Sequence, residues 1–188
     1  MNRIVRFFSA PKESPVLIAD PNEGPGKWQP FEGPLKEIPK GRTALYEVYG
    51  DPGFQTKADG KVTVSPVWER ASCVTARGLP GYAKPVYVHR LVEPYLREAM
   101  RRSVIAAPTY VIKTLGCFAP RHQRHDPSRP FSDHSWACAV DINSASNRPL
   151  TPGDMPPEFV EAWESVGFES GSQWKSFEDP MHFQLRRS

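Results

Sequence analysis

The residues best suited to chemistry lie in two short stretches of the second half of the chain. Residues 131–143 contain His134 and, seven positions later, Asp141. The other stretch contains Asp179 and, three positions later, His182. Two histidines and a carboxylate are a ligand set that catalytic zinc uses, with a fourth position open for water. A further carboxylate beside such a site can move the proton of that water, so the pattern fits metal-assisted hydrolysis.

Each pair of residues by itself has an ordinary explanation. A histidine and an aspartate seven positions apart more often mark a capped turn and a salt bridge than a metal site. The combination is more specific, because His134-x6-Asp141 enters a predicted strand and a second histidine, His182, follows near the C-terminus with a carboxylate three positions before it. We therefore treat these residues as one candidate site.

Both stretches fit one longer motif, Ser132-x-His134-x4-Ala139-x-Asp141 followed by Asp179-x2-His182. This motif resembles the zinc peptidases of the D-alanyl-D-alanine carboxypeptidase family (peptidase family M15), which includes D-Ala-D-Ala dipeptidases and phage L-alanyl-D-glutamate endopeptidases. The segment from Gly116 to Arg121 is similar to the strand and arginine that precede the histidine motif in that family. The resemblance covers about residues 61–188. It departs at Ala137, where the family usually has glycine, so the backbone there must accept a Cβ.

The resemblance implies a role for each residue of the motif. His134, Asp141 and His182 would bind Zn²⁺, and Asp179 would be the general base that takes a proton from water and gives it to the leaving amine. Arg121 would act in catalysis and substrate binding, facing the substrate or the developing oxyanion. Its alternative is a surface arginine that pairs with a nearby aspartate, Asp126 or Asp133.

Several neighbouring residues are open to two interpretations. Ser132 could bind substrate through a hydrogen bond or could be a turn-forming serine, and Trp174 could line the substrate cleft. Arg124 is a second candidate for the role of Arg121. Glu178 competes with Asp179 for the role of base, but in an extended backbone its side chain would point the opposite way.

Cysteine and other histidine residues offer rival sites. Cys138 could bind zinc with the histidines or act as a nucleophile paired with His134, but strand alternation places Cys138 on the face opposite Asp141. No cysteine-protease signature lies upstream. His122 and His125 lie in a polar loop whose spacing would bind metal only weakly.

Hydrophobic periodicity predicts the elements that position the site. Apolar residues at helical spacing predict a helix over residues 88–101, with its regular part beginning near Glu93 because Pro94 is tolerated only in a first turn. A second helix is predicted between Asp154 and Gly167. Short strands are predicted over residues 62–64, 85–88, 110–115, 139–142 and 181–185. Together with these elements, the family resemblance implies an α+β fold of the Hedgehog/DD-peptidase type: a small antiparallel sheet that carries the zinc cleft on one face, with helices packed behind it.

Composition sets the outer limits of this interpretation. The chain has 188 residues, 21 of them proline, and a formal net charge of +3. We expect a Pro-rich lead-in or tether over residues 1–60 that contributes no catalytic group, and a peptidase domain over residues 61–188. The modest charge argues against nucleic acid as a partner, and no stretch is long and apolar enough for a membrane span or a signal peptide. Three cysteines without paired spacing predict free thiols.

The family resemblance implies that the substrate is a peptide of bacterial peptidoglycan. Aspartate before the last histidine and the lack of a visible signal peptide favour an endolysin-like L-Ala-D-Glu endopeptidase. The alternatives are a D-Ala-D-Ala carboxypeptidase or dipeptidase, and a non-catalytic module that binds the wall or belongs to a particle. Such a protein would act at the cell wall after phage lysis or another delivery route, with a phage or injection-system partner bound through residues 1–60.

Overall fold

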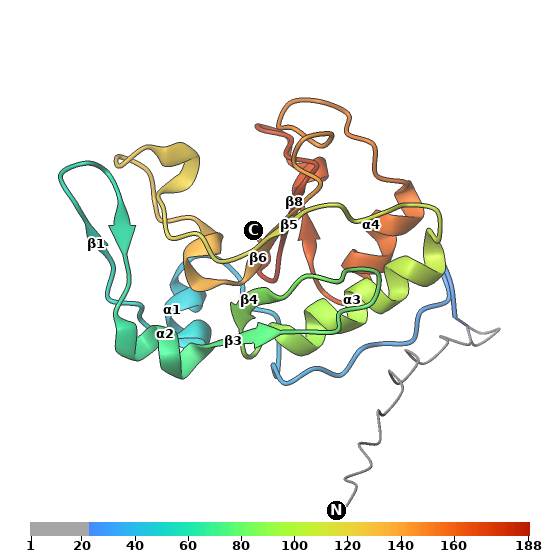
Figure 1. The fold of residues 1–188 in the computed structure, drawn as a ribbon, viewed down its shortest axis with the longest axis horizontal. Coiled ribbons are helices and arrows are strands. Elements are labelled where there is room, and N and C mark those ends of the chain that lie inside the picture. Colours follow the sequence, from blue (N-terminus) through green and yellow to red (C-terminus); the bar gives the residue numbers. More distant parts are fainter. Residues whose placement is uncertain (1–22) are drawn as a thin grey trace, which may run out of the picture.

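A small antiparallel sheet carries two residues of the candidate site, Asp141 and His182 (Figure 1). The computed structural model describes residues 23–188, and four of its strands are hydrogen-bonded in the order β5-β6-β8-β7. These strands are β5 (Leu115–Gly116), β6 (Ala139–Ile142), β7 (Glu169–Ser170) and β8 (His182–Gln184). The register of β6 and β8 places Asp141 opposite His182. With helices and two further hairpins around this sheet, the structure confirms the predicted α+β fold.

Two helices pack against each other beside the sheet, α3 (Glu93–Ala106) and α4 (Pro157–Glu164). Helix α3 begins at Glu93, with Pro94 in its first turn. This start and the strand at residues 86–89 confirm two predictions, and only the extension of the helix back to residue 88 is wrong, because Val88 is buried in that strand. Helix α4 lies within its predicted range, and the ring of its Trp163 packs 5.0 Å from that of Phe183 in β8.

Two short hairpins and a helix complete the frame. Strand β3 (Cys73–Ala76) pairs with β4 (Val86–His89), β1 (Gln55–Thr56) pairs with β2 (Val62–Thr63), and α2 (Pro66–Ser72) precedes β3. The strand predicted over residues 110–115 enters the ladder only at Leu115. The side chain of Asn143 explains this difference, since its Oδ1 accepts from the N–H groups of Lys113 and Thr114 and its Nδ2 donates to the carbonyl of Val111. An amide side chain thus satisfies backbone groups that a strand partner would otherwise bind.

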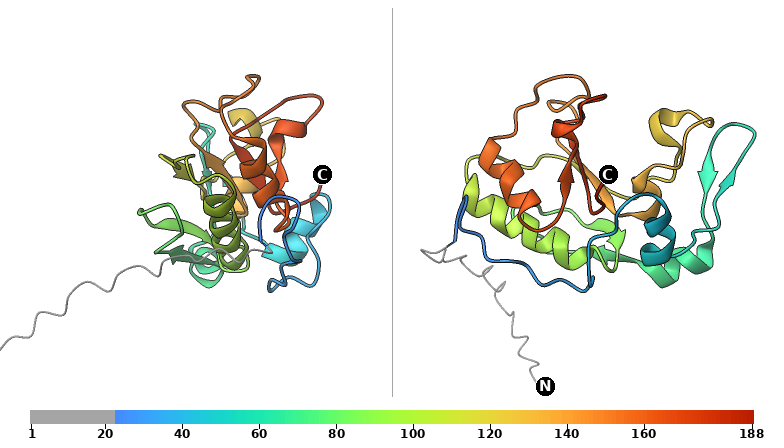
Figure 2. Two further views of the ribbon diagram at one scale, coloured as in Figure 1. Left: turned by 90° about the vertical axis from the view of Figure 1, so that its right-hand side faces the viewer. Right: turned by 180° about the vertical axis from the view of Figure 1, so that it is seen from behind.

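The described part of the predicted lead-in packs into the same core as the rest of the chain. Figure 2 shows residues from about 23 onward running alongside α3 before they reach α1 (Thr43–Tyr49). Leu45 and Tyr49 of α1 are buried, and the hydroxyl of Tyr49 donates to the carbonyl of Leu185 over 2.7 Å. The partner contact predicted for residues 1–60 stays a prediction, and residues 1–22 of that segment lie outside the described residues. Whether residues 61–188 fold without the segment before them stays a prediction.

Two further expectations concern thiols and membranes. Cys73, Cys117 and Cys138 are buried and free, as their spacing predicted. In the part of the chain that the structure describes, no helix combines the length and apolar character needed to cross a membrane.

Candidate metal centre

Three side chains from separate elements converge on one point. His134 lies in the short 3-10 helix η2 (Asp133–Trp136), Asp141 in β6 and His182 in β8. The Oδ1 atom of Asp141 is 3.0 Å from Nε2 of His134 and 3.0 Å from Nδ1 of His182, and the two histidine nitrogens are 3.3 Å apart. These atoms all lie within 4.8 Å of one another, so together they could hold a metal ion. The structure therefore brings together the three residues predicted as ligands.

The opposite nitrogen of each histidine has its own partner, which orients the ring. His134 Nδ1 is 2.6 Å from the carbonyl oxygen of Cys117, to which it can only donate, so Nε2 of the neutral ring keeps its lone pair for a metal. His182 Nε2 lies 3.3 Å from the side-chain amide of Gln184. Metal-binding histidines are commonly oriented in this way by an acceptor behind the ring. The donor set fits a divalent cation.

The cluster is also electrostatically suited to a cation. Burial opposes ionisation of Asp141, but the hydrogen bonds from His134 and His182 outweigh it and hold the pKa of this carboxyl far below its usual range. Burial lowers the pKa of His182, yet the hydrogen bond and charge of Asp141 raise it overall. The surroundings therefore favour the ionised form of Asp141, which is the form that binds a cation.

Asp179 and Glu178 occupy different environments. Asp179 lines the same cavity as His134 and His182, and its Oδ1 atom is buried without a hydrogen-bond partner in the structure. Burial raises the pKa of Asp179, and the nearby charge of Asp141 raises it further. Glu178 is exposed and does not line the cavity. A buried acceptor without a partner is costly in a folded protein, which makes Asp179 a candidate for a functional group.

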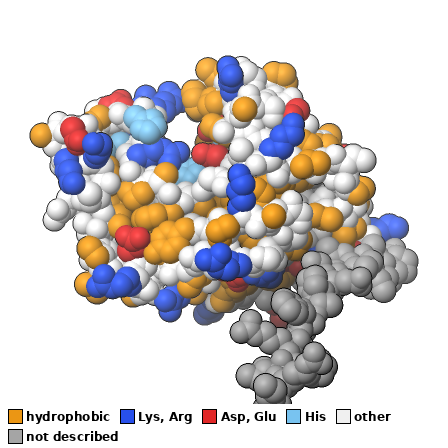
Figure 3. Space-filling model, viewed as in Figure 1, with side chains coloured by type: hydrophobic (Ala, Val, Ile, Leu, Met, Phe, Trp, Pro, Cys, Tyr) orange, Lys and Arg blue, Asp and Glu red, His pale blue; other side chains and the backbone are white. Residues whose placement is uncertain are grey.

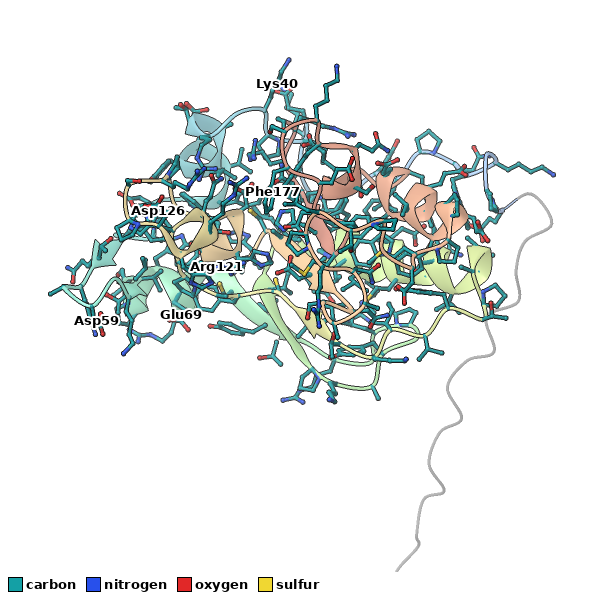
Figure 4. The ribbon with its side chains drawn as sticks, turned by 90° about the horizontal axis from the view of Figure 1, so that it is seen from above. Lys40, Asp59, Glu69, Arg121, Asp126 and Phe177 are labelled. Carbon is teal, nitrogen blue, oxygen red and sulfur yellow. The ribbon has the colours of Figure 1, made fainter. Side chains whose placement is uncertain are left out.

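The cavity beside the cluster has a volume of about 600 Å³ and is open to solvent. Figure 3 shows the hollow on this face, with histidine, acidic and basic side chains around it. The predicted residues Arg121, Ser132 and Trp174 all line the cavity. Arg121 reaches toward the site, with its Nη2 3.7 Å from Oδ2 of Asp141. Figure 4 shows it between Asp59 and Phe177.

The two aspartates that were expected as alternative partners of Arg121 pair with other arginines. Asp126 pairs with Arg129, and Asp133 pairs with other arginines, so neither forms an ion pair with Arg121. Trp174 stands 5.2 Å from the ring of His182, and its Nε1 donates to Glu169. Trp174 therefore packs against a ligand candidate while it lines the cavity.

The structure also answers two questions raised by the sequence, the role of Cys138 and the conformation of Ala137. Cys138 is fully buried and its Sγ donates to the carbonyl of Asp133, so the thiol lies outside the His-Asp-His group. Burial raises the pKa of this thiol well above its usual value, which disfavours a thiolate nucleophile.

Ala137 has a φ of 53°, a left-handed conformation in which glycine would be less strained. The backbone at this departure from the family does accept a Cβ.

A buried charge network behind the ligands was not predicted from the sequence. Asp133 accepts from Arg42 at 3.2 Å through Oδ1 and from Arg186 at 2.7 Å through Oδ2. Gln184, whose side-chain amide lies behind His182, borders this network. Alternation could have revealed part of it, because His182, Gln184 and Arg186 share one face of an extended chain. The contribution of Arg42 is decided only by the tertiary fold.

Comparison with known proteins agrees with this geometry. No curated protein and no solved structure gives a significant match to the chain. A family model described as D-alanyl-D-alanine carboxypeptidase matches residues 125–185, a segment that contains His134, Asp141, Asp179 and His182. The segment with the His-Asp-His group is therefore a domain of this family of M15 metallopeptidases.

Proposed function

We propose that the protein is a zinc-dependent D-Ala-D-Ala carboxypeptidase that acts on peptides of bacterial peptidoglycan. The observation that carries the proposal is the buried His-Asp-His group beside Asp179 in one open cavity, within the segment that matches the carboxypeptidase family. Two histidines, one carboxylate and an open cleft suit catalytic rather than structural zinc, which is usually enclosed by four protein ligands. The place of action would be the cell wall.

The residues of the cleft can divide the steps of hydrolysis among them. Zinc held by His134, Asp141 and His182 would supply a Lewis acid and make water acidic enough to ionise near neutral pH. Asp179 accepts the proton of the attacking water at its carboxylate and then donates it to the departing amine. Its raised pKa makes it a stronger base than an exposed aspartate. Arg121, close to Asp141, is placed to position the scissile carbonyl and neutralise charge that develops on its oxygen.

The L-Ala-D-Glu endopeptidase reaction favoured by sequence features becomes the second candidate. The family description supports the carboxypeptidase, since it names that activity. One structural feature favours the endopeptidase. A second cavity of about 530 Å³, bounded by the β1–β2 hairpin, shares Arg121 with the first and could take a longer stretch of substrate. The two reactions release different products and can be separated directly.

The deciding experiment is digestion of the stem pentapeptide L-Ala-D-Glu-L-Lys-D-Ala-D-Ala by the zinc-loaded protein, with products identified by mass spectrometry. Release of one D-alanine supports the carboxypeptidase, whereas release of L-alanine supports the endopeptidase. Activity should vanish on chelation and return with zinc. A zinc-loaded protein that leaves both the peptide and purified peptidoglycan intact would contradict both proposals and favour the non-catalytic wall-binding module.

A further inference from the structure

Two side chains from opposite walls of the cleft meet at its rim. Arg124 belongs to the 3-10 helix η1 (Gln123–His125), and Phe177 follows η3 (Gly171–Gln173). The guanidinium carbon of Arg124 lies 3.7 Å from the centroid of the Phe177 ring. Both residues line the cavity that His134 and His182 also line. In Figure 4 Phe177 lies on the C-terminal wall, across from the loop that carries Arg121 and Asp126.

The loop of Arg124 is held in an unusual conformation. Arg124 and His125 have φ values of 55° and 57°, in the left-handed region that residues with a Cβ rarely adopt. Two such residues in succession persist only where surrounding contacts determine the turn. This turn redirects the chain at the point where the Arg124 side chain reaches across to Phe177.

His122 supplies the contacts that fix the turn. Its Nδ1 donates to the carbonyl of Arg129 over 2.6 Å, and its Nε2 is 2.8 Å from the hydroxyl of Thr56 in β1. The ring also stacks on Phe131 with centroids 4.4 Å apart. The base of the loop is thus anchored both to its own far end and to the β1–β2 hairpin. Arg124 is therefore presented from a supported loop rather than from a free one.

Arg124 differs from the other arginines of the cleft in the groups that surround its guanidinium. Arg121 faces Asp141 at 3.7 Å, Arg129 pairs with Asp126 at 3.4 Å, and Arg186 pairs with Asp133 at 2.7 Å. For Arg124 the described residues provide an aromatic face and no carboxylate. Stacking occupies the face of the guanidinium and leaves its N–H groups, which lie in the plane, able to donate.

We propose that Arg124, held flat against Phe177, binds the terminal carboxylate of the substrate and thereby selects peptides with a free C-terminus. This inference rests on the proposed carboxypeptidase function. A planar guanidinium matches a carboxylate with two parallel hydrogen bonds, and a stacked side chain loses less conformational freedom on binding than a free one. Arg121, already near Asp141, remains available for the scissile carbonyl. Arg124 is then a specificity-determining residue of the cleft.

The test compares two peptides, Nα,Nε-diacetyl-L-Lys-D-Ala-D-Ala and its C-terminal amide. The zinc-loaded parent should show a higher kcat/KM for the acid, and Arg124→Gln should reduce this acid-to-amide ratio about 10-fold or more, the loss expected for a charge-assisted hydrogen bond. Phe177→Leu should reduce the ratio by a smaller factor, since the charge stays but its orientation is lost. Arg129→Gln is the matched control, an arginine of the same cavity already paired with Asp126, and should keep the parent ratio.

Binding measurements keep the inference separate from the proposed function. Calorimetry of both peptides with zinc-loaded Asp179→Asn protein should give a lower Kd for the acid, and adding Arg124→Gln should remove that difference. If the parent cleaves neither peptide, the proposed function fails, and the binding data still decide the role of Arg124. Equal kcat/KM of the parent for both peptides, or an unchanged ratio in a folded, zinc-loaded Arg124→Gln variant, would overturn the inference.

Discussion

Asp141 and His182 lie directly opposite each other in the antiparallel pair of β6 and β8, with Oδ1 of Asp141 3.0 Å from Nδ1 of His182. Side chains of directly opposed residues leave the same face of a sheet, so the ladder itself sets the spacing of these two groups. The third group, His134, is brought in by η2, which ends just before β6. A site built on a sheet in this way is more rigid than one built on loops.

The first prediction concerns metal content. The purified parent should contain close to one zinc ion per chain, because three preoriented ligands leave one open position. His134→Ala and His182→Ala should each lose most of the metal when measured by elemental analysis. His125→Ala is the control, since His125 is exposed and lies outside the cluster. Unchanged zinc content in both ligand variants would show that the metal is bound elsewhere.

The second prediction separates base from ligand. Asp179→Asn should keep its zinc, because Asp179 lies outside the His-Asp-His group, while turnover falls on the order of 10²–10⁴-fold, the loss typical of a general base. Glu178→Gln should be nearly as active as the parent, because this side chain is exposed and does not line the cavity. Steady-state kinetics with matched zinc content measure both effects. An active Asp179→Asn and an inactive Glu178→Gln would exchange the two roles.

The third prediction concerns the segment before residue 61. Arg42→Gln should reduce the free energy of unfolding by about 1–3 kcal/mol, because it removes a charged partner from Asp133, which is buried next to His134. Lys40→Gln should be neutral, since Lys40 is exposed. Denaturant unfolding of the two variants and the parent gives the comparison. Equal stability of all three would mean that Arg186 alone supports Asp133.

Truncation at Lys61 extends the same test. Although no catalytic group is expected before this residue, the truncated chain lacks Leu45 and Tyr49, which are buried in the core. We therefore expect the truncated chain to lose cooperative thermal unfolding, measured by circular dichroism. A stable truncated protein that binds zinc and hydrolyses peptide would instead support residues 61–188 as an independent domain.

The fourth prediction is a pH dependence of stability that arises from His89. Burial lowers the pKa of His89 from 6.5 to about 4, and the residue is only 3% exposed. The unfolded chain therefore binds a proton near pH 6.5 and the folded chain does so only near pH 4. The stability contributed by neutral His89 is complete above pH 6.5 and is lost as pH falls from there toward 4, by about 3 kcal/mol in total.

The variant His89→Asn isolates this contribution. Its amide oxygen can replace Nδ1 as the acceptor of the Leu91 N–H, and it does not titrate. Between pH 6.5 and 4 the free energy of unfolding should fall less steeply for His89→Asn than for the parent in urea titrations. Parallel curves for the two proteins across this window would contradict the assignment to His89.

The sequence by itself determined the chemistry and the main elements that carry it. The spacing of His134, Asp141 and His182 predicted a metal site, and apolar periodicity predicted the sheet strands of Asp141 and His182 and the two helices. Such features are encoded locally, because a strand alternates its faces and a helix repeats every 3.6 residues. Pro94 likewise fixed the start of α3, since proline is accepted in a first helical turn.

The tertiary structure alone decided which distant groups surround that chemistry. The ion pair of Arg42 with Asp133, the contact of Arg124 with Phe177 and the burial of His89 join residues whose sequence spacing carries no periodic signal. The side chain of Asn143 takes the place of a strand partner, so the predicted strand over residues 110–115 joins the sheet only at Leu115. Long-range packing and hydrogen-bond satisfaction depend on the whole fold, and they override local preference wherever the two differ.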